Sequence, residues 1–268
     1  MTDSIDIGVL DSGVGGLSVL REIRGLLPDT ALGYIADSAF VPYGRLSAET
    51  IIERTCALAD IVVAHGARMV VVACNTATAA AVPTLRTRLE VPVVGMEPAV
   101  KPAAQATRNG TIGVLATVGT LNSARFAALL DRFAGPVEVI TQPCPGLVEC
   151  VERGDLDSPE TRLLVRRFVE PVVAGGADTL ILGCTHYPFL RPVIEDCAGP
   201  GVALVDTGRA VARQVARVWE SQGGGGSGGS ARFWTSGSLA QLRHALDVLW
   251  APGATAATLP GDGGTNHA

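Results

Sequence analysis

The chain has 268 residues, of which 47% are hydrophobic, 18% are charged and 4% are aromatic. This composition allows a large core of aliphatic side chains, which is typical of parallel strands buried beneath helices. The formal net charge of −5 argues against nucleic acid or an anionic membrane as the main partner, and no apolar stretch reaches the length of about 18 residues that would cross a bilayer.

Short apolar runs alternate with helical patterns along the chain. The helical patterns have apolar residues three or four positions apart, as at Val211, Val215 and Val218, so that these residues share one face. Alternation of strand and helix predicts a parallel α/β architecture. The predicted strands, in chain order, are Ile5–Asp11, Leu32–Asp37, Met69–Cys74, Pro92–Met96, Thr111–Thr117, Val137–Thr141, Thr179–Cys184, Val202–Asp206 and Phe233–Thr235.

The C-terminal part of the chain contains two segments with little propensity for order. Residues 223–230 read GGGGSGGS, which predicts a flexible connector. A last strand and helix are expected between Phe233 and Trp250. Residues 252–268 are rich in Gly, Ala, Thr and Pro, and we predict that they form a disordered tail.

Two pairs of matching motifs indicate an internal repeat. Ile7–Leu10 reads IGVL, and the same four residues recur at Ile112–Leu115. Later in each half an apolar strand ends in a cysteine and a polar pair: Val71–Thr76 reads VVACNT, and Ile181–His186 reads ILGCTH. Because the motifs come in the same order and at similar spacing, we expect two equivalent α/β halves.

The cysteines match neither a metal site nor a disulfide framework. They form no CxxC pair, and with four scattered histidines they show no zinc spacing, so no metal is predicted. Met1–Ile7 carries two aspartates and no long apolar run, which predicts no signal peptide and a cytoplasmic protein, where disulfides are rare. The six cysteines are Cys56, Cys74, Cys144, Cys150, Cys184 and Cys197.

Lys101 is the single lysine of the chain, beside twenty arginines. An enzyme that held pyridoxal phosphate as a Schiff base would have to use this lysine. Nothing in the sequence near Lys101 resembles a phosphate cradle. We therefore expect chemistry that uses no cofactor.

Cys74 and Cys184 each stand at the predicted carboxyl end of a strand, where functional groups collect in parallel sheets. Partial positive charge at a helix N-terminus is expected to lower the pKa of such a thiol. Two halves that face each other would place the two thiols on opposite sides of one cleft. This arrangement suits racemisation, in which a base removes a proton from one face of a Cα and an acid supplies one to the other face. The alternative is that both are buried cysteines without a role.

Three polar motifs follow predicted strands, and two of them have two interpretations. Asp11–Gly16 is either a glycine-rich turn or a carboxylate and hydroxyl at a strand end, with Asp11 accepting a proton from a cysteine; it contains neither GxGxxG nor GK[ST]. Pro42–Gly44 is a turn signal. Thr117 and Thr120 are either site hydroxyls or part of a helix cap.

His186 and Glu152 have weaker sequence signals. His186 lies two residues from Cys184, which makes it a candidate for activating that thiol. Glu152 precedes Arg153 and Gly154, and its local sequence predicts only a charged residue on the surface.

At these motifs the sequence resembles the glutamate racemases, within the wider aspartate/glutamate racemase group. The resemblance runs from residue 7 to about residue 206, and the two cysteine motifs together are highly specific. Asp37 is present although its neighbours depart from the Gly-Asp-Thr form of many members, and Thr78 stands where a serine is common. The matching segments are Asp11–Gly16, Pro42–Gly44, Ala73–Thr76 and Gly183–Pro188, with a weaker match at Phe233–Ser238.

The resemblance implies a fold of two pseudo-symmetric parallel-sheet α/β domains with the active site in the cleft between them. Residues 1–98 and 207–250 would form the first, discontinuous domain, and residues 99–206 would form the second. The expected homodimer remains open, because the connector at residues 223–230 loosens the C-terminal segment.

The resemblance also implies roles for particular residues. Cys74 would take the proton from D-glutamate and Cys184 from L-glutamate. Asp11 would assist Cys74, while His186 and Glu152 would assist Cys184. The substrate would be held by Asp11, Ser12, Pro42, Tyr43, Gly44, Asn75, Thr76, Thr117, Thr120, Thr185 and His186.

The resemblance implies that the D-glutamate is used for peptidoglycan precursors. Three alternative functions stay open. A related racemase could act on aspartate or a hydantoin with the same cysteine pair. A non-catalytic binding protein of the same fold could inhibit DNA gyrase, as some glutamate racemases do. A cysteine hydrolase would use one cysteine and form an acyl-enzyme.

Overall fold

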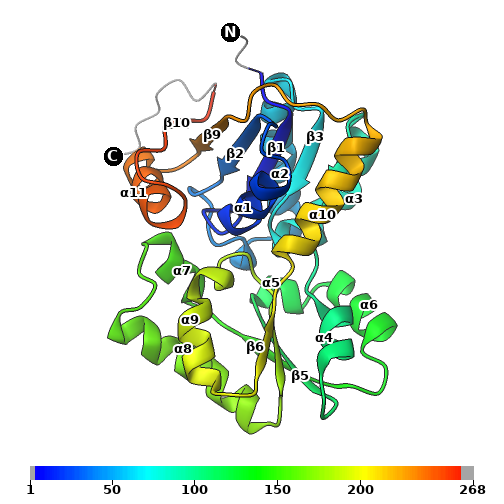
Figure 1. Cartoon of the computed structure of the whole chain (residues 1–268), viewed down its shortest axis with the longest axis vertical. Coiled ribbons are helices and arrows are strands. Elements are labelled where there is room, and N and C mark those ends of the chain that lie inside the picture. Colours follow the sequence, from blue (N-terminus) through cyan, green and yellow to red (C-terminus); the bar gives the residue numbers. More distant parts are fainter. Residues whose placement is uncertain (1–3, 261–268) are drawn as a thin grey trace.

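The computed structural model describes residues 4–260, which form two α/β units stacked along the long axis of the molecule (Figure 1). Each unit is built around one parallel β-sheet. The first sheet has the order β10-β9-β2-β1-β3-β4, and the second has the order β6-β5-β7-β8. The strands are β1 Ile7–Asp11, β2 Leu32–Ala36, β3 Met69–Val72, β4 Val93–Val94, β5 Thr111–Ala116, β6 Glu138–Pro143, β7 Thr179–Leu182, β8 Ala203–Val205, β9 Ala231–Thr235 and β10 Ala256–Thr258.

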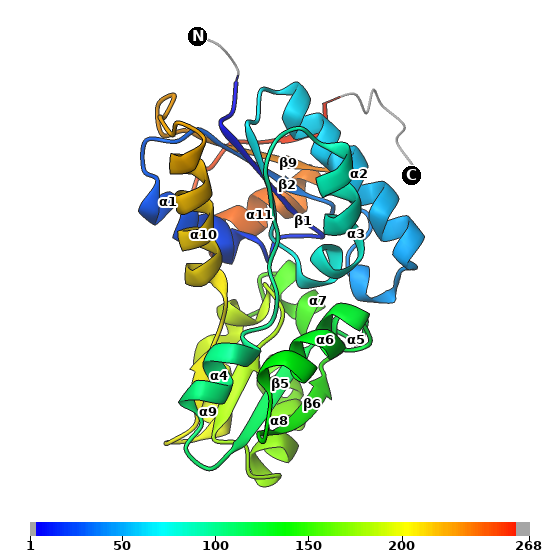
Figure 2. The same cartoon turned by 90° about the vertical axis from the view of Figure 1, so that its right-hand side faces the viewer.

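Helices cover both faces of each sheet (Figure 2). In the first unit, α1 packs with α10 on one face, and α2 packs with α3 on the other. In the second unit, α8 packs with α9, and α4 packs with α6. The helices are α1 Leu17–Leu26, α2 Ala48–Ala64, α3 Asn75–Arg88, α4 Val100–Ala106, α5 Val118–Leu121, α6 Ala124–Phe133, α7 Leu147–Glu152, α8 Pro159–Ala174, α9 Arg191–Ala198, α10 Gly208–Ser221 and α11 Leu239–Leu249, with short 3-10 turns η1 Tyr43–Arg45 and η2 Tyr187–Leu190.

The central strands are apolar because both of their faces are covered. Every residue of β1 and β3 is buried, as are those of β7. Such strands read as continuous aliphatic runs rather than as alternating patterns. This is why the chain builds a large core with few aromatic residues.

The strand order confirms the internal repeat. The order β2-β1-β3-β4 in the first sheet matches β6-β5-β7-β8 in the second, with the two IGVL segments in the equivalent strands β1 and β5. All nine predicted strands are present, with ends shifted by up to two residues. The fold class of two pseudo-symmetric parallel α/β units is therefore confirmed, while the domain boundaries at residues 98/99 and 206/207 stay predictions.

The tail from residue 252 contains a strand that the sequence did not indicate. Ala256–Thr258 forms β10 and pairs in parallel with Phe233–Thr235 of β9 at the edge of the first sheet. The prediction of disorder was therefore wrong for these residues, because an open sheet edge supplies hydrogen-bond partners that a local composition argument does not include. Residues 261–268 of the predicted tail lie outside the described residues.

The Gly/Ser connector lies against the end of the first sheet that is remote from the second unit (Figure 1). The backbone N–H and the hydroxyl of Ser227 donate to Asp6 Oδ2 at 3.0 and 2.8 Å. The N–H groups of Gly228 and Gly229 donate to the carbonyl of Asp29 at 3.1 and 2.9 Å. No helix within residues 4–260 is long and apolar enough to span a membrane.

Asp6 is the residue on which we expect the packing of this connector to depend. Its buried carboxylate also accepts from the Ala31 N–H at 2.9 Å, and these hydrogen bonds outweigh the cost of burial and lower its pKa from 3.8. Asp6→Ala should therefore reduce the free energy of unfolding at pH 7 by about 1–3 kcal/mol, since it leaves buried donors without an acceptor. Urea unfolding measures this loss.

The pH dependence of this effect follows from the sign of the shift. A carboxylate with a lowered pKa stabilises the fold above about pH 4, and this contribution disappears as the group is protonated. The difference between Asp6→Ala and the wild type should shrink at lower pH. Asp60→Ala, which removes a half-exposed ion pair with Arg88, is the control and should cost less than about 1 kcal/mol. A difference that persists unchanged at pH 3 would contradict the assignment.

Candidate active site

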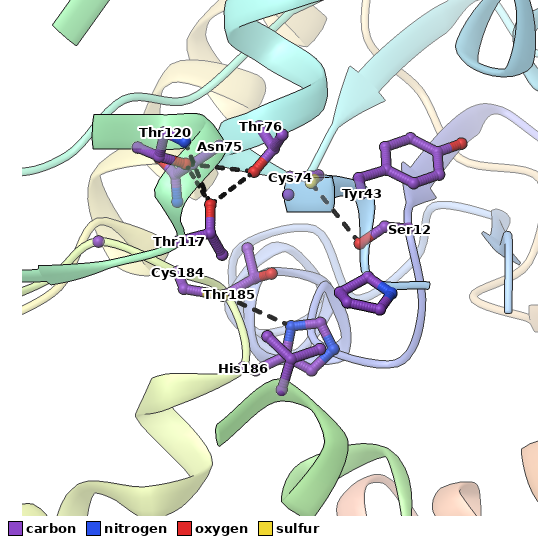
Figure 3. A pocket seen from close by; sticks show the side chains of 14 residues that line it. Ser12, Tyr43, Cys74, Asn75, Thr76, Thr117, Thr120, Cys184, Thr185 and His186 are labelled. Carbon is purple, nitrogen blue, oxygen red and sulfur yellow. Dashed lines mark hydrogen bonds between the residues drawn. The ribbon is translucent and has the colours of Figure 1, made fainter. Parts of the chain in front are cut away.

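The carboxyl ends of the central strands of the two sheets face each other across a small cavity (Figure 3). Cys74 follows β3, Cys184 follows β7, and both side chains are buried. The cavity measures about 10 Å³, close to the space that one water molecule needs, so the two units are tightly closed around it. It is lined by Ser12, Pro42, Tyr43, Gly44, Cys74, Asn75, Thr76, Thr117, Thr120, Val148, Gly183, Cys184, Thr185 and His186.

Cys74 caps the N-terminus of α3. Its Sγ accepts from the Ala77 N–H at 3.5 Å and donates to Ser12 Oγ at 3.7 Å. Burial nevertheless raises the pKa of the thiol, and the nearby carboxylate of Asp11 raises it further. The Ala77 N–H at the helix N-terminus lowers the pKa of Cys74 as expected, but the predicted net lowering was wrong, because desolvation of the thiolate outweighs this one hydrogen bond.

Cys184 has a different environment: its thiol contacts a histidine, and that histidine contacts a carboxylate. Cys184 Sγ and His186 Nδ1 are 3.6 Å apart, and His186 Nε2 lies 2.6 Å from Glu152 Oε1. Burial lowers the pKa of His186, but its hydrogen bonds with Cys184 and Glu152 outweigh burial and raise the pKa well above 6.5. A protonated imidazole donates from both ring nitrogens, so it stabilises a thiolate on one side and a carboxylate on the other.

Glu152 joins the two units. In addition to His186, its Oε1 accepts from the backbone N–H of Val14 in the first unit, at 2.7 Å. Gly13 and Gly15 are needed for this close approach, since a Cβ at Gly13 would lie 1.9 Å from Glu152 Oε1 and a Cβ at Gly15 would lie 2.2 Å from His186 Nδ1. The glycines thus admit side chains of the other unit to the loop after β1.

Asp11 lies behind the cavity and is fully buried. Its carboxylate accepts from the Gly13 N–H at 3.1 Å and from the Thr185 hydroxyl at 3.4 Å. Burial raises its pKa to about 6, with an opposing effect from the charge of His186. The charge of Asp11 raises the pKa of Cys74, and neither Asp11 nor Glu152 lines the cavity.

Three threonine hydroxyls connect the units on the other side of the cavity (Figure 3). Thr76 Oγ1 lies 3.0 Å from Thr117 Oγ1 and 3.2 Å from Thr120 Oγ1, and Thr117 donates to Thr120 at 3.0 Å. Thr117 also caps α5 by accepting from the Thr120 N–H. The cap interpretation is confirmed for Thr117, and the role of these hydroxyls in binding stays a prediction.

Asn75 has polar atoms that are not satisfied within the described residues. Its side chain is 5% exposed, and neither Oδ1 nor Nδ2 has a hydrogen-bond partner there. A buried amide without partners carries a cost of about 1–3 kcal/mol, which an additional polar group in the cavity would remove.

Asp37 holds the Pro42–Gly44 loop against the cavity. The Tyr43 hydroxyl donates to Asp37 Oδ2 at 2.6 Å, and Arg54 forms two hydrogen bonds with the same carboxylate at 3.0 and 2.7 Å. The hydroxyl of Tyr43 is thus bonded outside the cavity, while Pro42, Tyr43 and Gly44 contribute to the cavity lining.

Sequence reasoning missed Val148 and Gly183 among the residues that line the cavity. Gly183 directly precedes Cys184 and could have been included with that motif. Val148 comes from α7, and no sequence signal separates it from an ordinary core residue. No group of three or more metal-binding side chains occurs within residues 4–260.

Comparison with known proteins agrees with this geometry. The family model for Asp/Glu/Hydantoin racemase matches residues 7–215. A glutamate racemase from Pseudomonas aeruginosa is 57% identical over 251 residues, which cover 92% of this chain and 95% of the relative. One from Ectopseudomonas mendocina is also 57% identical, covering 91% and 94% of the two chains.

Solved structures give the same result. A glutamate racemase isoform from Bacillus anthracis has a TM-score of 0.86 at 32% identity and covers 97% of this chain and 98% of its own. The Escherichia coli glutamate racemase, solved with L-glutamate and the activator UDP-MurNAc-ala, has a TM-score of 0.85 at 34% identity and covers 95% and 97%. The chain therefore belongs to the Asp/Glu/Hydantoin racemase family and, within it, to the glutamate racemases, which are isomerases.

Proposed function

We propose that the protein interconverts L- and D-glutamate by a two-base mechanism in which Cys74 and Cys184 are the acid and the base. The observation that carries the proposal is the placement of two buried thiols at equivalent strand ends on either side of one cavity. One thiolate removes the Cα proton and becomes a thiol, and the opposite thiol donates its proton to the other face and becomes a thiolate. The net change is inversion at Cα.

Cys184 is the proposed base for L-glutamate. Its thiolate is stabilised by the imidazole of His186, which the carboxylate of Glu152 holds in orientation. A hydrogen-bonded series of thiol, imidazole and carboxylate is a common way to activate a nucleophile or a base in enzymes. In the reverse direction the same thiol is the acid.

Cys74 is the proposed base for D-glutamate, with Asp11 and Ser12 as its supporting groups. Burial raises the pKa of Cys74, so that its thiolate is a strong base once it is formed. The carboxylate of Asp11 is the proposed acceptor of the thiol proton, because its charge acts on Cys74, and Ser12 accepts a hydrogen bond from the thiol.

Polar groups around the cavity are the proposed binding groups for the two carboxylates and the amine of glutamate. The unpartnered amide of Asn75 and the hydroxyls of the three threonines supply donors and acceptors that substrate would engage. The substrate follows from the relatives, since the Escherichia coli enzyme was solved with L-glutamate. The proposed set is Asp11, Ser12, Pro42, Tyr43, Gly44, Asn75, Thr76, Thr117, Thr120, Thr185 and His186.

Substrate entry requires the two units to separate. A cavity of about 10 Å³ holds one water molecule and not glutamate. Closure around the substrate then removes water, which strengthens each electrostatic contact to the developing carbanion. The chain itself supplies the groups named above, and the proposal assigns no step to a cofactor.

In the cell, the proposed role is cytoplasmic supply of D-glutamate for peptidoglycan precursors, which is the role associated with this family. Aspartate is the alternative substrate that the first assay must include. A homodimer and an interaction with DNA gyrase stay predictions, since no contact within the described residues tests them.

Loss of either thiol should abolish racemisation. Incubation of the wild type with L-glutamate in D2O, without added cofactor, should remove both the optical activity and the α-proton NMR signal. Cys74→Ala and Cys184→Ala should each lower the racemisation rate by at least about 10³-fold, because one face of Cα then lacks its proton donor or acceptor. Cys56→Ala, a buried cysteine of α2 outside the cavity, is the matched control and should retain activity. Normal turnover by either active-site variant would disprove the two-base mechanism.

The pH profile should report on Asp11. Its pKa is raised to about 6 in the folded protein, so the carboxylate that can accept the Cys74 proton is present above that pH and is protonated below it. We expect kcat/KM to fall about tenfold for each pH unit below 6. In Asp11→Asn this acid limb should be absent and the rate at pH 8 lower by about 10²-fold.

Asp60→Asn, at an exposed position, should keep the wild-type profile. An Asp11→Asn enzyme that retains the acid limb at pH 6 would show that another group titrates there.

A further inference from the structure

One peptide group connects a buried tyrosine of the first unit to the carboxylate of the second. The hydroxyl of Tyr34, on β2, donates to the Gly13 carbonyl at 2.6 Å. The N–H of the same peptide unit, that of Val14, donates to Glu152 Oε1 at 2.7 Å. The two ends of the Gly13–Val14 peptide are therefore held by side chains from different units.

The hydrogen bonds continue from this peptide to the second thiol. Glu152 Oε1 lies 2.6 Å from His186 Nε2, and His186 Nδ1 lies 3.6 Å from Cys184 Sγ. Figure 3 shows the last of these contacts at the edge of the cavity. Donation by Tyr34 to the Gly13 carbonyl polarises the peptide and makes the Val14 N–H a stronger donor. Val14 and His186 then meet the same oxygen of Glu152, so the effect on His186 is to fix the position of that oxygen.

The position of Tyr34 is fixed by its surroundings. Its side chain is fully buried, and a Cβ at Gly16 would lie 3.0 Å from its hydroxyl oxygen. Burial raises the pKa of Tyr34, and the charge of Asp11 adds to this effect, so the phenol keeps its proton and remains a donor. The Gly13 carbonyl is thus oriented by a rigid group on a central strand.

The second unit has no equivalent of this tyrosine. Val9 of β1 pairs with Tyr34, and the corresponding Val114 of β5 pairs with Thr141, which is exposed. Cys74, for its part, hydrogen-bonds with Ser12 of its own unit. The connection through a peptide of the opposite unit is therefore a property of Cys184 alone.

We infer that Tyr34 is a positioning residue for the Cys184 half of the reaction. It holds the Gly13–Val14 peptide in the orientation that lets the Val14 N–H meet Glu152, and through Glu152 it orients His186 toward the thiol. Because Val14 and Glu152 belong to different units, this support exists only when the units are closed. The hydrogen bonds that orient His186 toward Cys184 are therefore complete only in the closed arrangement of the units. The contact between Cys74 and Ser12 lies within one unit and does not depend on closure. The inference rests on the proposed two-base function.

Tyr34→Phe tests the inference because it removes one hydroxyl and keeps the ring. We expect kcat/KM for racemisation to fall about tenfold, the effect of one strong hydrogen bond. The fall must be equal for both enantiomers, since they are equally stable. The discriminating measurement is the primary isotope effect on kcat/KM with glutamate deuterated at Cα. Proton transfer at Cys184 should become the slowest step, so the effect should rise with L-glutamate and fall with D-glutamate.

A double-mutant cycle tests whether Tyr34 acts through Glu152. In a Glu152→Gln background, adding Tyr34→Phe should change the rate and the isotope effects by less than twofold, because the two residues share one pathway. Thr55→Val, which removes a buried hydroxyl bonded to a helical carbonyl of α2, controls for lost stability and should keep wild-type isotope effects.

Isotope effects in Tyr34→Phe that match the wild type, or additive losses in the double variant, would overturn the role of Tyr34. A wild type that fails to racemise glutamate, or that works without Cys184, would instead overturn the proposed function. The two failures are thus distinguishable in one set of experiments.

Discussion

The two hydrogen bonds to Glu152 Oε1, one from Val14 of the first unit and one from His186 of the second, are the interaction on which the site depends. The side chain of Glu152 is 15% exposed, so protein donors must replace most of the water around its carboxylate. Those donors come together because Gly13 and Gly15 leave room for the other unit's side chains. The orientation of the imidazole follows from these bonds, and together with the threonine contacts they hold the two units closed around the cavity.

The repeat gives the two thiols equivalent positions but not equivalent chemistry. Cys74 and Cys184 both follow the third strand of their repeat, which suits a reaction that must address both faces of one carbon. Their neighbours differ, with Ser12 and Asp11 near the first thiol and His186 and Glu152 near the second. The two enantiomers direct their Cα protons to opposite sides of the cavity. The two sides can therefore differ chemically, even though L- and D-glutamate are equally stable.

The sequence predicts features that are local, and it fails where distant segments meet. Aliphatic runs located all nine expected strands, and the strand-end position of Cys74 and Cys184 indicated the site. The pKa of Cys74 was predicted in the wrong direction because the burial of the thiol and the charge of Asp11 are not visible in the local sequence around Cys74. Val148 looks like any core residue, and Tyr34 like any strand residue, until the loop after β1 is in place. The strand β10 needs the edge of β9, which no local pattern reveals.

The small volume of the closed cavity has a consequence for the enzyme between turnovers. With space for about one water molecule, the cavity restricts the exchange of a thiol proton with bulk solvent while the units are together. In the proposed mechanism, each conversion therefore leaves Cys74 and Cys184 with their protonation states exchanged. The free enzyme then exists in two forms, each ready for only one enantiomer. At high substrate concentration the return between these forms, and not the chemistry at Cα, would set the rate.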